Sequence, residues 1–239
     1  MALYGAPVWY DALSRENKLV LRRAQRHLAV RVVRGYRTVS AEAALALAGS
    51  MPWDLDALIL AAVHKWRGDQ RSQGQRPAPR EIDAERLRLE EDAVARWRER
   101  LDDSTYGRRT TGAIAPVLTE WVRRQHGRLT FRLTQVLSGH GCFEAYLAKI
   151  GREPTAECHH CQRCDEDTAQ HTLASCPAWV GERGVLVSVV GGDLYRYRRL
   201  SRGWPRARKR GRRCSPSARP SSRRRKRRRG SGRLTPPPR

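Results

Sequence analysis

Hydrophobic residues recur at helical spacing through positions 13–150 of the chain. Residues 13–34 predict an amphipathic helix that Ser14 can cap. Its expected apolar face consists of residues that follow the roughly 3.6-residue helical period, namely Leu19, Leu21, Ala24, Leu28, Val32 and Val33. A short Ala/Leu-rich helix that Thr38 or Ser40 can cap is expected next, and a third helix is predicted near 53–71.

The pattern is less regular in the second half of this region. Residues 81–102 mix charges of both signs with a partial apolar stripe, which predicts a helix packed on one side only. Residues 103–112 are expected to form a loop, and 113–126 another helix. The segment 129–137 is compatible with either a strand or a helix, because its β-branched residues do not decide between the two. A short helix is predicted at 142–150.

Together these elements predict a mainly α fold. We expect a helical segment, a Gly- and Pro-containing linker, a second helical segment, a Cys-rich module with a following helix, and a tail. Their boundaries are 1–72, 73–80, 81–152, 153–194 and 195–239 respectively.

Positive charge is concentrated at the carboxy-terminal end of the chain. The formal net charge is +24, and residues 201–239 contribute 17 Lys or Arg and no acidic residue. This leaves 31 basic against 24 acidic residues in 1–200, which is typical of a mildly basic globular protein. Apolar periodicity ends after Leu194, so 195–239 is expected to be disordered. Such a tail indicates a phosphate-rich partner or a localisation signal, and we expect a nuclear protein.

Other classes of protein are not indicated by the sequence. No run of about 18 apolar residues occurs, so we expect neither a transmembrane helix nor a membrane partner. The first residues lack the basic region and apolar stretch of a secretory signal. Clustered cysteines in such a chain are more typical of a metal site in a reducing compartment than of disulfides.

The most specific chemical signal is a cluster of cysteines around one histidine. It has the spacing Cys158-x2-Cys161-x9-His171-x4-Cys176. A C-x2-C pair can hold one side of a Zn²⁺ ion from a single turn, and an H-x4-C pair can complete the tetrahedron. Because four protein ligands leave no position for water, we expect a structural Zn²⁺ in a zinc knuckle rather than a hydrolytic centre.

Two questions about this module remain open from the residues alone. Cys164 can form an alternative pair with Cys161, and two histidines of the same stretch are further possible ligands. The second question is whether the module contacts nucleic acid or only holds the chain together. Arg163 and Arg183 flank it, but its acidic run 165–167, which we expect to be solvated, would repel phosphate.

The other chemical signals are weak. The chain has no G-x4-G-K-[ST] phosphate loop and no H-E-x2-H motif. Asp102 and Asp103 are paired carboxylates, but they end a charged helix and are expected to be solvated. His140 is interpreted as a turn histidine, because nothing nearby in the sequence supplies a nucleophile. The tryptophans at apolar positions are expected in the core, namely Trp53, Trp66, Trp97 and Trp121.

Three blocks of sequence, taken in order, resemble a known family. The first is LYGAPVW at 3–9 with the segments at 22–40 and 42–55, the second is LTQVLSGHGCFEAYLAKIGR at 133–152, and the third is the Cys/His stretch at 158–179. They closely resemble the region downstream of the reverse transcriptase domain in non-LTR (LINE-type) retrotransposons of insects, in particular those that insert into ribosomal RNA genes. The resemblance covers about four fifths of the chain.

This resemblance implies a polyprotein in which an endonuclease is joined to an RNA-directed DNA polymerase that acts by target-primed reverse transcription. The segment 1–72 would lie in or just beyond the helical thumb, and the partners would be element RNA, target DNA and the palm and fingers of the polyprotein. The family's Cys-Cys-His-Cys pattern maps onto Cys158, Cys161, His171 and Cys176. Its aromatic-Ala-Asp-Asp signature has no match here, so we expect no catalytic residue and no polymerase or nuclease activity from this chain alone.

Arginines on two predicted helices are the expected nucleic-acid contacts, provided that they converge on one face. They are Arg22, Arg23, Arg26, Arg31, Arg34, Arg123, Arg124 and Arg128. Two alternatives remain open. The chain can instead be a zinc-containing adaptor that binds protein and uses its basic tail as a nuclear signal, or the non-functional product of a decayed element.

Overall fold

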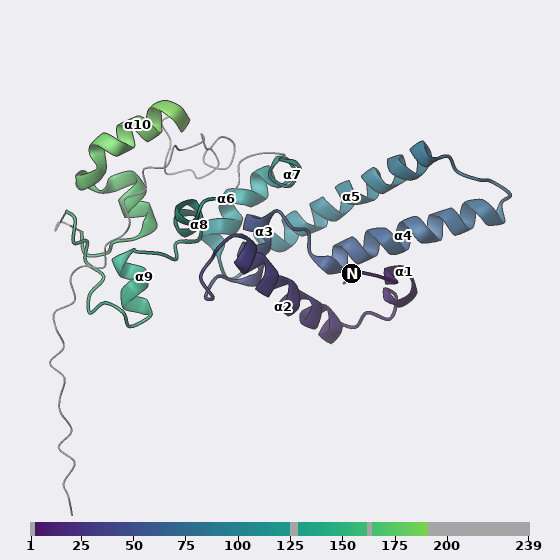
Figure 1. Cartoon of the computed structure of the whole chain (residues 1–239), viewed down its shortest axis with the longest axis horizontal. Coiled ribbons are helices and arrows are strands. Elements are labelled where there is room, and N and C mark those ends of the chain that lie inside the picture. Colours follow the sequence, from purple (N-terminus) through teal and green to yellow (C-terminus); the bar gives the residue numbers. More distant parts are fainter. Residues whose placement is uncertain (1–2, 125–128, 162–163, 191–239) are drawn as a thin grey trace, which may run out of the picture. The chain divides into compact units, whose positions relative to one another are not determined.

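The computed structural model describes residues 3–124, 129–161 and 164–190 of the chain (Figure 1). Within these ranges every regular element is a helix and no strand occurs, so the predicted mainly α fold is confirmed. The predicted disordered tail at 195–239 lies outside the described residues.

The first long helix begins where the sequence predicts it. The helix α1 (Ala6–Trp9) is a single short turn that the hydrophobic pattern does not show. The helix α2 (Arg15–Val32) begins after Ser14, whose hydroxyl accepts a hydrogen bond from the Asn17 amide at 3.2 Å. A serine in this position pairs one of the backbone donors that the first helical turn leaves without a partner.

The buried face of α2 differs from the one that the pattern predicts. Three of the expected core residues, Leu19, Leu28 and Val32, are 44%, 52% and 72% exposed. The helix instead buries Gln25 and Ala29, while Val33, which the pattern does predict as apolar, is buried just after the helix end. A polar side chain can take this place because its amide is hydrogen-bonded to the segment that joins the next two helices.

The next helix, α3 (Ala41–Ala48), is buried on all sides. Ser40, one of the two predicted caps, accepts a hydrogen bond from the Ala43 amide at 3.3 Å, and Gly49 ends the helix in the left-handed region. Its residues from Ala43 to Leu47 are at most 1% exposed. The helices α2 and α6 pack against it. Small alanine side chains let these neighbours approach the α3 backbone closely.

Two long helices, α4 (Trp53–Ser72) and α5 (Pro79–Asp102), lie side by side (Figure 1). Pro79 is at the start of α5, where its missing N–H has no cost, so the helix begins earlier than the predicted residue 81. The predicted linker therefore forms the turn between α4 and α5, and helices on both sides of it contribute to one core. Trp97, fully buried, belongs to that core, as the sequence predicts.

The following segment is more helical than expected. The helix α6 (Arg108–Ile114) occupies part of the predicted loop 103–112, and it follows Gly107, whose φ is +75°. A 3₁₀ turn, η1 (Ala115–Val117), separates it from α7 (Leu118–Arg123), because Pro116 interrupts regular α-helical hydrogen bonding in the predicted helix 113–126.

The undecided segment 129–137 is a helix rather than a strand. The helix α8 (Phe131–Ser138) is capped by Thr130, whose hydroxyl accepts from the Leu133 amide at 3.2 Å. It is followed by α9 (Glu144–Lys149), by two short turns, η2 (His171–Ser175) and η3 (Pro177–Trp179), and by α10 (Val180–Val190). The η2 turn is π-helical and η3 is 3₁₀.

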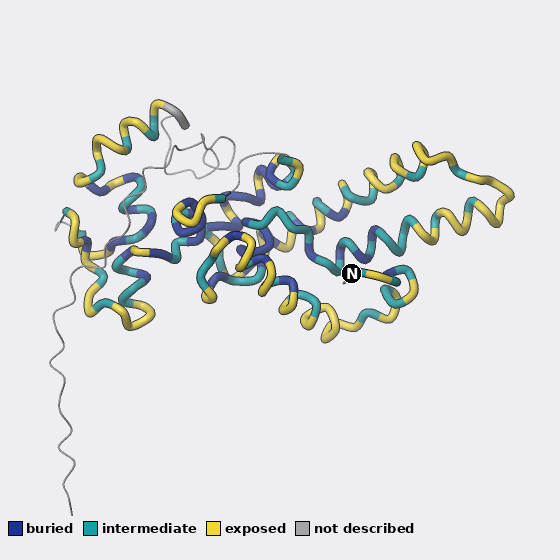
Figure 2. The backbone as a smooth tube through the Cα atoms, in the orientation of Figure 1, coloured by how far each residue is buried: buried dark blue, intermediate teal, exposed yellow. Residues whose placement is uncertain are grey.

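Buried residues gather around α3, α6 and α8 (Figure 2). A second, smaller cluster of Phe143, Tyr146 and Ala169 packs α9 against the middle of the Cys-rich module, just before His171. Within the described ranges, no single helix is long and apolar enough to cross a membrane. The pair α3 and α4, bent by 62°, meets that test of length and composition only when the two are taken together.

We predict that Gln25→Ala lowers the free energy of unfolding by about 1–3 kcal/mol, because the half-buried partners of this buried side chain lose their hydrogen bonds. The Gln25 amide nitrogen donates to the Met51 carbonyl at 2.7 Å and the Ser50 hydroxyl at 3.1 Å, and its oxygen accepts from the Trp53 amide at 2.9 Å. Urea denaturation followed by circular dichroism measures the change. Gln73→Ala, in the exposed α4–α5 turn, is the control, and equal stability of the two variants would contradict the prediction.

We also predict that Asp56 destabilises the fold at neutral pH. Burial and the neighbouring Glu90 raise the pKa of Asp56 from 3.8 to about 6. The folded chain therefore holds this proton more tightly than the unfolded chain, and that stabilisation is present below pH 3.8 and lost as the pH rises through about 6. Asp56→Asn should gain about 1 kcal/mol over the native chain between pH 4 and 7, after allowance for solvent screening.

Denaturation of both chains across this pH range measures the effect. Asp69→Asn, which changes an exposed acid of the same helix, is the control. If the native chain and Asp56→Asn have parallel stability curves across this range, the carboxyl is not the destabilising group.

Candidate metal centre

Four side chains of the Cys-rich module meet at one point. The potential ligand atoms of Cys158, Cys161, His171 and Cys176 all lie within 4.8 Å of one another. Two of the separations are shorter: 3.9 Å between the Sγ atoms of Cys158 and Cys176, and 3.5 Å between Cys161 Sγ and His171 Nε2. These are the four residues that the spacing predicts as ligands.

Two separations within this cluster are compatible with ligands around one tetrahedral metal ion such as zinc. Zinc–sulfur bonds of about 2.3 Å and zinc–nitrogen bonds of about 2.0 Å set sulfur–sulfur separations of about 3.8 Å and sulfur–nitrogen separations of about 3.5 Å in a tetrahedron. The observed 3.9 Å and 3.5 Å match these values. Three thiolates and one imidazole are also a donor set that favours zinc over calcium or magnesium. The cluster can therefore hold a metal ion with four protein ligands.

Local backbone structure explains the spacing of the second ligand pair. His171 begins the π-helical turn η2, and the Cys176 amide donates to the His171 carbonyl at 2.7 Å. A hydrogen bond across five residues closes a wider turn than the α-helical one. The two ligands at either end of H-x4-C are thereby brought to the same side of the chain. Thr168 caps this turn, since its hydroxyl accepts from the His171 amide at 3.1 Å.

The three other candidate ligands in the same stretch, Cys164, His159 and His160, contact groups outside the cluster. The Cys164 thiol donates to the Glu166 carbonyl at 3.3 Å. His159 lies 3.6 Å from the Glu144 carboxylate, and the His160 ring packs edge-on against Trp179 with their centroids 5.0 Å apart. The cluster of four is therefore distinct from each alternative that the spacing leaves open.

The centre is largely shielded from solvent. Cys158, His171 and Cys176 are buried and Cys161 is half-buried. Burial raises the pKa of the Cys158 thiol to about 12. Since a metal ligand must be a thiolate, metal binding and proton release are coupled at this site.

Asp167 corrects the expectation that the acidic run 165–167 is solvated. It is 2% exposed and joins the module to α9. Its carboxylate accepts hydrogen bonds from the Glu144 amide at 3.3 Å and the Thr172 hydroxyl at 2.9 Å, and its carbonyl accepts from the Ala145 amide at 3.1 Å. The sequence gives no signal for this role, because all three acids have polar neighbours and the partners in α9 lie more than twenty residues away.

Several arginines that the sequence presents as nucleic-acid contacts are used within the fold. Arg22 forms an ion pair with Glu42 of α3. Arg26 donates to the Val39 carbonyl at 2.8 and 3.0 Å and also to the Arg37 carbonyl.

Two further arginines also bind neighbouring carbonyls. Arg124 stacks on the Trp121 ring at 3.8 Å, donates to the Trp121 carbonyl, and donates to the Leu47 carbonyl at 3.4 Å. In the Cys-rich module, Arg183 donates to the Ala174 carbonyl at 2.8 Å and to the Cys176 carbonyl.

The remaining predicted contacts differ in their surroundings. Arg123 lies 3.4 Å from Glu91 on the surface of α5. Arg23, Arg31 and Arg34 are exposed, and their guanidinium groups make no hydrogen bond or ion pair with any residue that the structure describes. Arg128 lies outside the described ranges.

We predict that the chain binds one Zn²⁺ ion and that Cys176→Ser lowers its affinity by more than about 100-fold, since loss of a ligand should exceed the effect of losing an outer-shell partner. Metal content after dialysis against a competing chelator, read by mass spectrometry, measures this. Cys164→Ser is the matched control and should retain the ion. A Cys164→Ser chain that loses zinc as readily as Cys176→Ser would show that the ligand set is wrong.

No family model and no solved structure matches this chain. Curated proteins of one kind of mobile element do match. The chain is 28% identical over 200 residues to the Retrovirus-related Pol polyprotein from type-1 retrotransposable element R1 4 of Nasonia vitripennis, which covers 80% of this chain and 49% of the relative. It is 32% identical over 202 residues to the corresponding polyprotein of element R1 2 of the same wasp, with 79% and 48% covered.

A third relative is the 115 kDa protein in type-1 retrotransposable element R1DM of Drosophila melanogaster. It is 33% identical over 190 residues, which cover 76% of this chain and 18% of the relative. The chain thus spans about half the length of two of these relatives and under a fifth of the third. The matches confirm the resemblance seen in the sequence blocks, and the chain belongs to the R1-type non-LTR retrotransposon polyproteins, of which it represents a part.

Proposed function

We propose that this chain is a zinc-stabilised, nucleic-acid-binding part of its polyprotein. It holds element RNA or target DNA beside an active site that another part of the polyprotein supplies. The observation on which this proposal depends is the match, over about four fifths of the chain, to Pol polyproteins of R1 elements. The wider activity that the family resemblance implies, target-primed reverse transcription, belongs to that larger protein.

The distribution of charge supports a polyanionic partner. Arg23 and Arg31 on α2 and Arg34 just after it keep their charge exposed, and the tail adds 17 basic residues between 201 and 239. Each phosphate that such groups neutralise releases bound counterions, which is the main source of affinity in non-specific nucleic-acid binding. The tail also supports a nuclear location, which stays a prediction.

We propose that the zinc ion has a structural part in this function. The four ligands form a closed shell, so the ion would offer no position for a reacting water. Around the centre, Asp167 and Arg183 bind backbone groups of the protein itself. These contacts support a module whose role is to order the chain next to α9. The nucleic acid would then be bound mainly by other surfaces.

A protein-binding adaptor is the second candidate, favoured by exposed aliphatic residues on α2. Val20, Leu28 and Val32 are 61%, 52% and 72% exposed. Exposed apolar groups of this kind on one helix are typical of a surface that another protein covers. The occupant in this reading is another part of the same polyprotein, such as its palm or fingers, since the relatives extend well beyond the matched region.

Binding of the full zinc-loaded chain to single-stranded RNA across a salt series tests the proposal. A peptide of residues 195–239 is the comparator, because a polycation binds any phosphate polymer. We predict that the full chain binds at least about 10-fold more tightly than the peptide, with a steeper salt dependence, because it adds further phosphate contacts. Cys176→Ser should lose most of this difference. Equal affinity of chain and peptide would contradict nucleic-acid binding by the folded part and favour the adaptor.

A further inference from the structure

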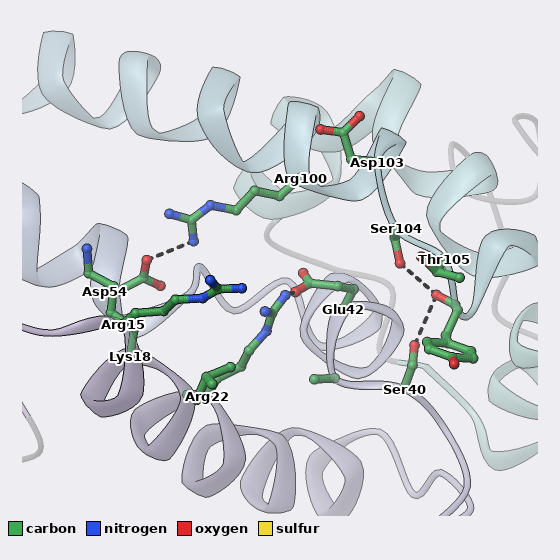
Figure 3. Close-up of a pocket in the computed structure, with 13 residues that line it drawn as sticks. Arg15, Lys18, Arg22, Ser40, Glu42, Asp54, Arg100, Asp103, Ser104 and Thr105 are labelled. Carbon is green, nitrogen blue, oxygen red and sulfur yellow. Dashed lines mark hydrogen bonds and ion pairs between the residues drawn. The ribbon is translucent and has the colours of Figure 1, made fainter.

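A cavity of about 650 Å³ lies between α2, α3, the start of α4 and the end of α5 (Figure 3). The helix α2 contributes Arg15, Lys18 and Arg22 to its lining, and α5 contributes Arg100. In Figure 3 the guanidinium groups of Arg15, Arg22 and Arg100 point into the same space. Arg15, Lys18 and Arg100 are not among the residues that the sequence predicts as nucleic-acid contacts.

Acidic groups in this cavity neutralise only part of its positive charge. Arg22 is paired with Glu42, and Arg100 lies 2.8 Å from the carboxylate of Asp54. The side chains of Arg15 and Lys18 make no hydrogen bond or ion pair with any residue in the described part of the chain.

The four cations that line this cavity outnumber its three carboxylates, which belong to Glu42, Asp54 and Asp103. The carboxylate of Asp103 points away from Arg15 and Arg22 (Figure 3). Burial, together with the charge of Arg100, lowers the pKa of Arg22. The cavity therefore has two uncommitted cations next to two ion pairs, an arrangement that suits an incoming phosphate.

An exposed aromatic ring stands at the edge of this cavity on a fixed piece of backbone. The carbonyl of Tyr106 accepts hydrogen bonds from the Ser104 hydroxyl at 2.7 Å and the Ser40 hydroxyl at 3.3 Å. Gly107, with φ +75°, lies so close to α3 that a Cβ there would be 2.5 Å from the Ser40 hydroxyl and 2.8 Å from Ala43. The backbone is thus held in place while the Tyr106 residue is 75% exposed and its hydroxyl has no partner among the described residues.

A second cavity, of about 560 Å³, shares Tyr106 and Ser40 with the first. Its lining includes Phe143 and Ile150, together with the charged residues Arg109, Lys149 and Glu166. A volume of this size falls in the range of small-ligand sites, which are mostly apolar with a few polar groups. Tyr106 therefore stands between a cationic cavity and a largely apolar one.

We infer that Tyr106 and these two cavities form one binding site for a single-stranded nucleic acid. Arg15 and Lys18 bind its phosphates, the Tyr106 ring stacks on a base, and the second cavity receives the neighbouring base. This inference rests on the proposed function and names the surface at which the nucleic acid binds. Single strands are indicated because a base face is free to stack on an aromatic side chain only when the base leaves the duplex.

The phosphate and base contacts have different signatures in a salt series. Stacking is a largely salt-independent contribution, so Tyr106→Ala should weaken binding by about 5- to 100-fold at every salt concentration. Loss of a phosphate contact to a single strand should reduce the salt slope by about 0.7, so Arg15→Gln with Lys18→Gln should flatten it by about 1.4. Tyr106→Phe keeps the ring and should bind like the native chain.

The experiment uses the full zinc-loaded chain and an oligouridylate probe, with a duplex of equal length as competitor. Tyr4→Ala is the matched control for the ring, because Tyr4 is also exposed and lines neither cavity. Lys65→Gln with Arg80→Gln removes the same charge from exposed positions outside both cavities. Every variant keeps the basic tail, so its contribution cancels in the comparison.

Photo-crosslinking supplies a readout that the tail cannot imitate. A probe with one 5-iodouracil should crosslink to Tyr106, with the modified peptide identified by mass spectrometry. Tight binding with variants equal to their controls and no crosslink at Tyr106 would overturn the inference while leaving the proposed function intact. Binding no tighter than the tail peptide alone would overturn both. Competition by the duplex as strong as that by the single strand would overturn the assignment to single strands.

Discussion

The burial of α3 on all sides is the constraint on which the rest of the helical region depends. Residues 43–47 of this helix are at most 1% exposed, so its neighbours must supply both apolar contact and hydrogen bonds. Trp121 supplies one of these hydrogen bonds, because its Nε1 donates to the Ala46 carbonyl at 2.6 Å. At the other end, Ser40 caps the helix and also binds the loop that precedes α6. A buried helix with small side chains therefore fixes the positions of elements that are far apart in the sequence.

The same constraint explains why so many arginines serve the fold. Glu42 lies on the buried helix, and a buried carboxylate is costly without a cation, so Arg22 turns inward to pair with it. Arg26 and Arg124 donate to carbonyls at the two ends of the same region, where α-helical hydrogen bonding stops. The number of basic residues on a helix is therefore a poor measure of its contacts with phosphate. The cations that indicate a phosphate-binding surface are those without a partner among the described residues, such as Arg15 and Lys18.

Local signals in the sequence were enough for the features that depend on near neighbours. Ser14 was recognisable as a cap and Ser40 as one of two candidate caps. The spacing predicted Cys158, Cys161, His171 and Cys176 as a ligand set while it left Cys164 open as an alternative. The sequence could not show that α2 buries Gln25 instead of Leu28, because the partners of that amide lie 25 to 28 residues away. The burial of Asp167 was hidden for the same reason, since its partners in α9 precede it by more than twenty residues. Sequence periodicity reports a helix, but the face it buries is decided by tertiary contacts.

The hydrogen bonds of α9 connect the metal centre to the cavities beside Tyr106. Thr172, one residue after the ligand His171, binds Asp167, whose carbonyl holds the Ala145 amide in α9. Tyr146 of the same helix then shares a hydrogen bond of 2.8 Å with Thr38, next to the cap of α3. Phe143 and Lys149, at the two ends of α9, line the second cavity. An ion held by the four ligands would order the π-helical turn and with it one wall of this cavity, so the proposed nucleic-acid binding would depend on the metal even without direct contact between the metal module and the nucleic acid.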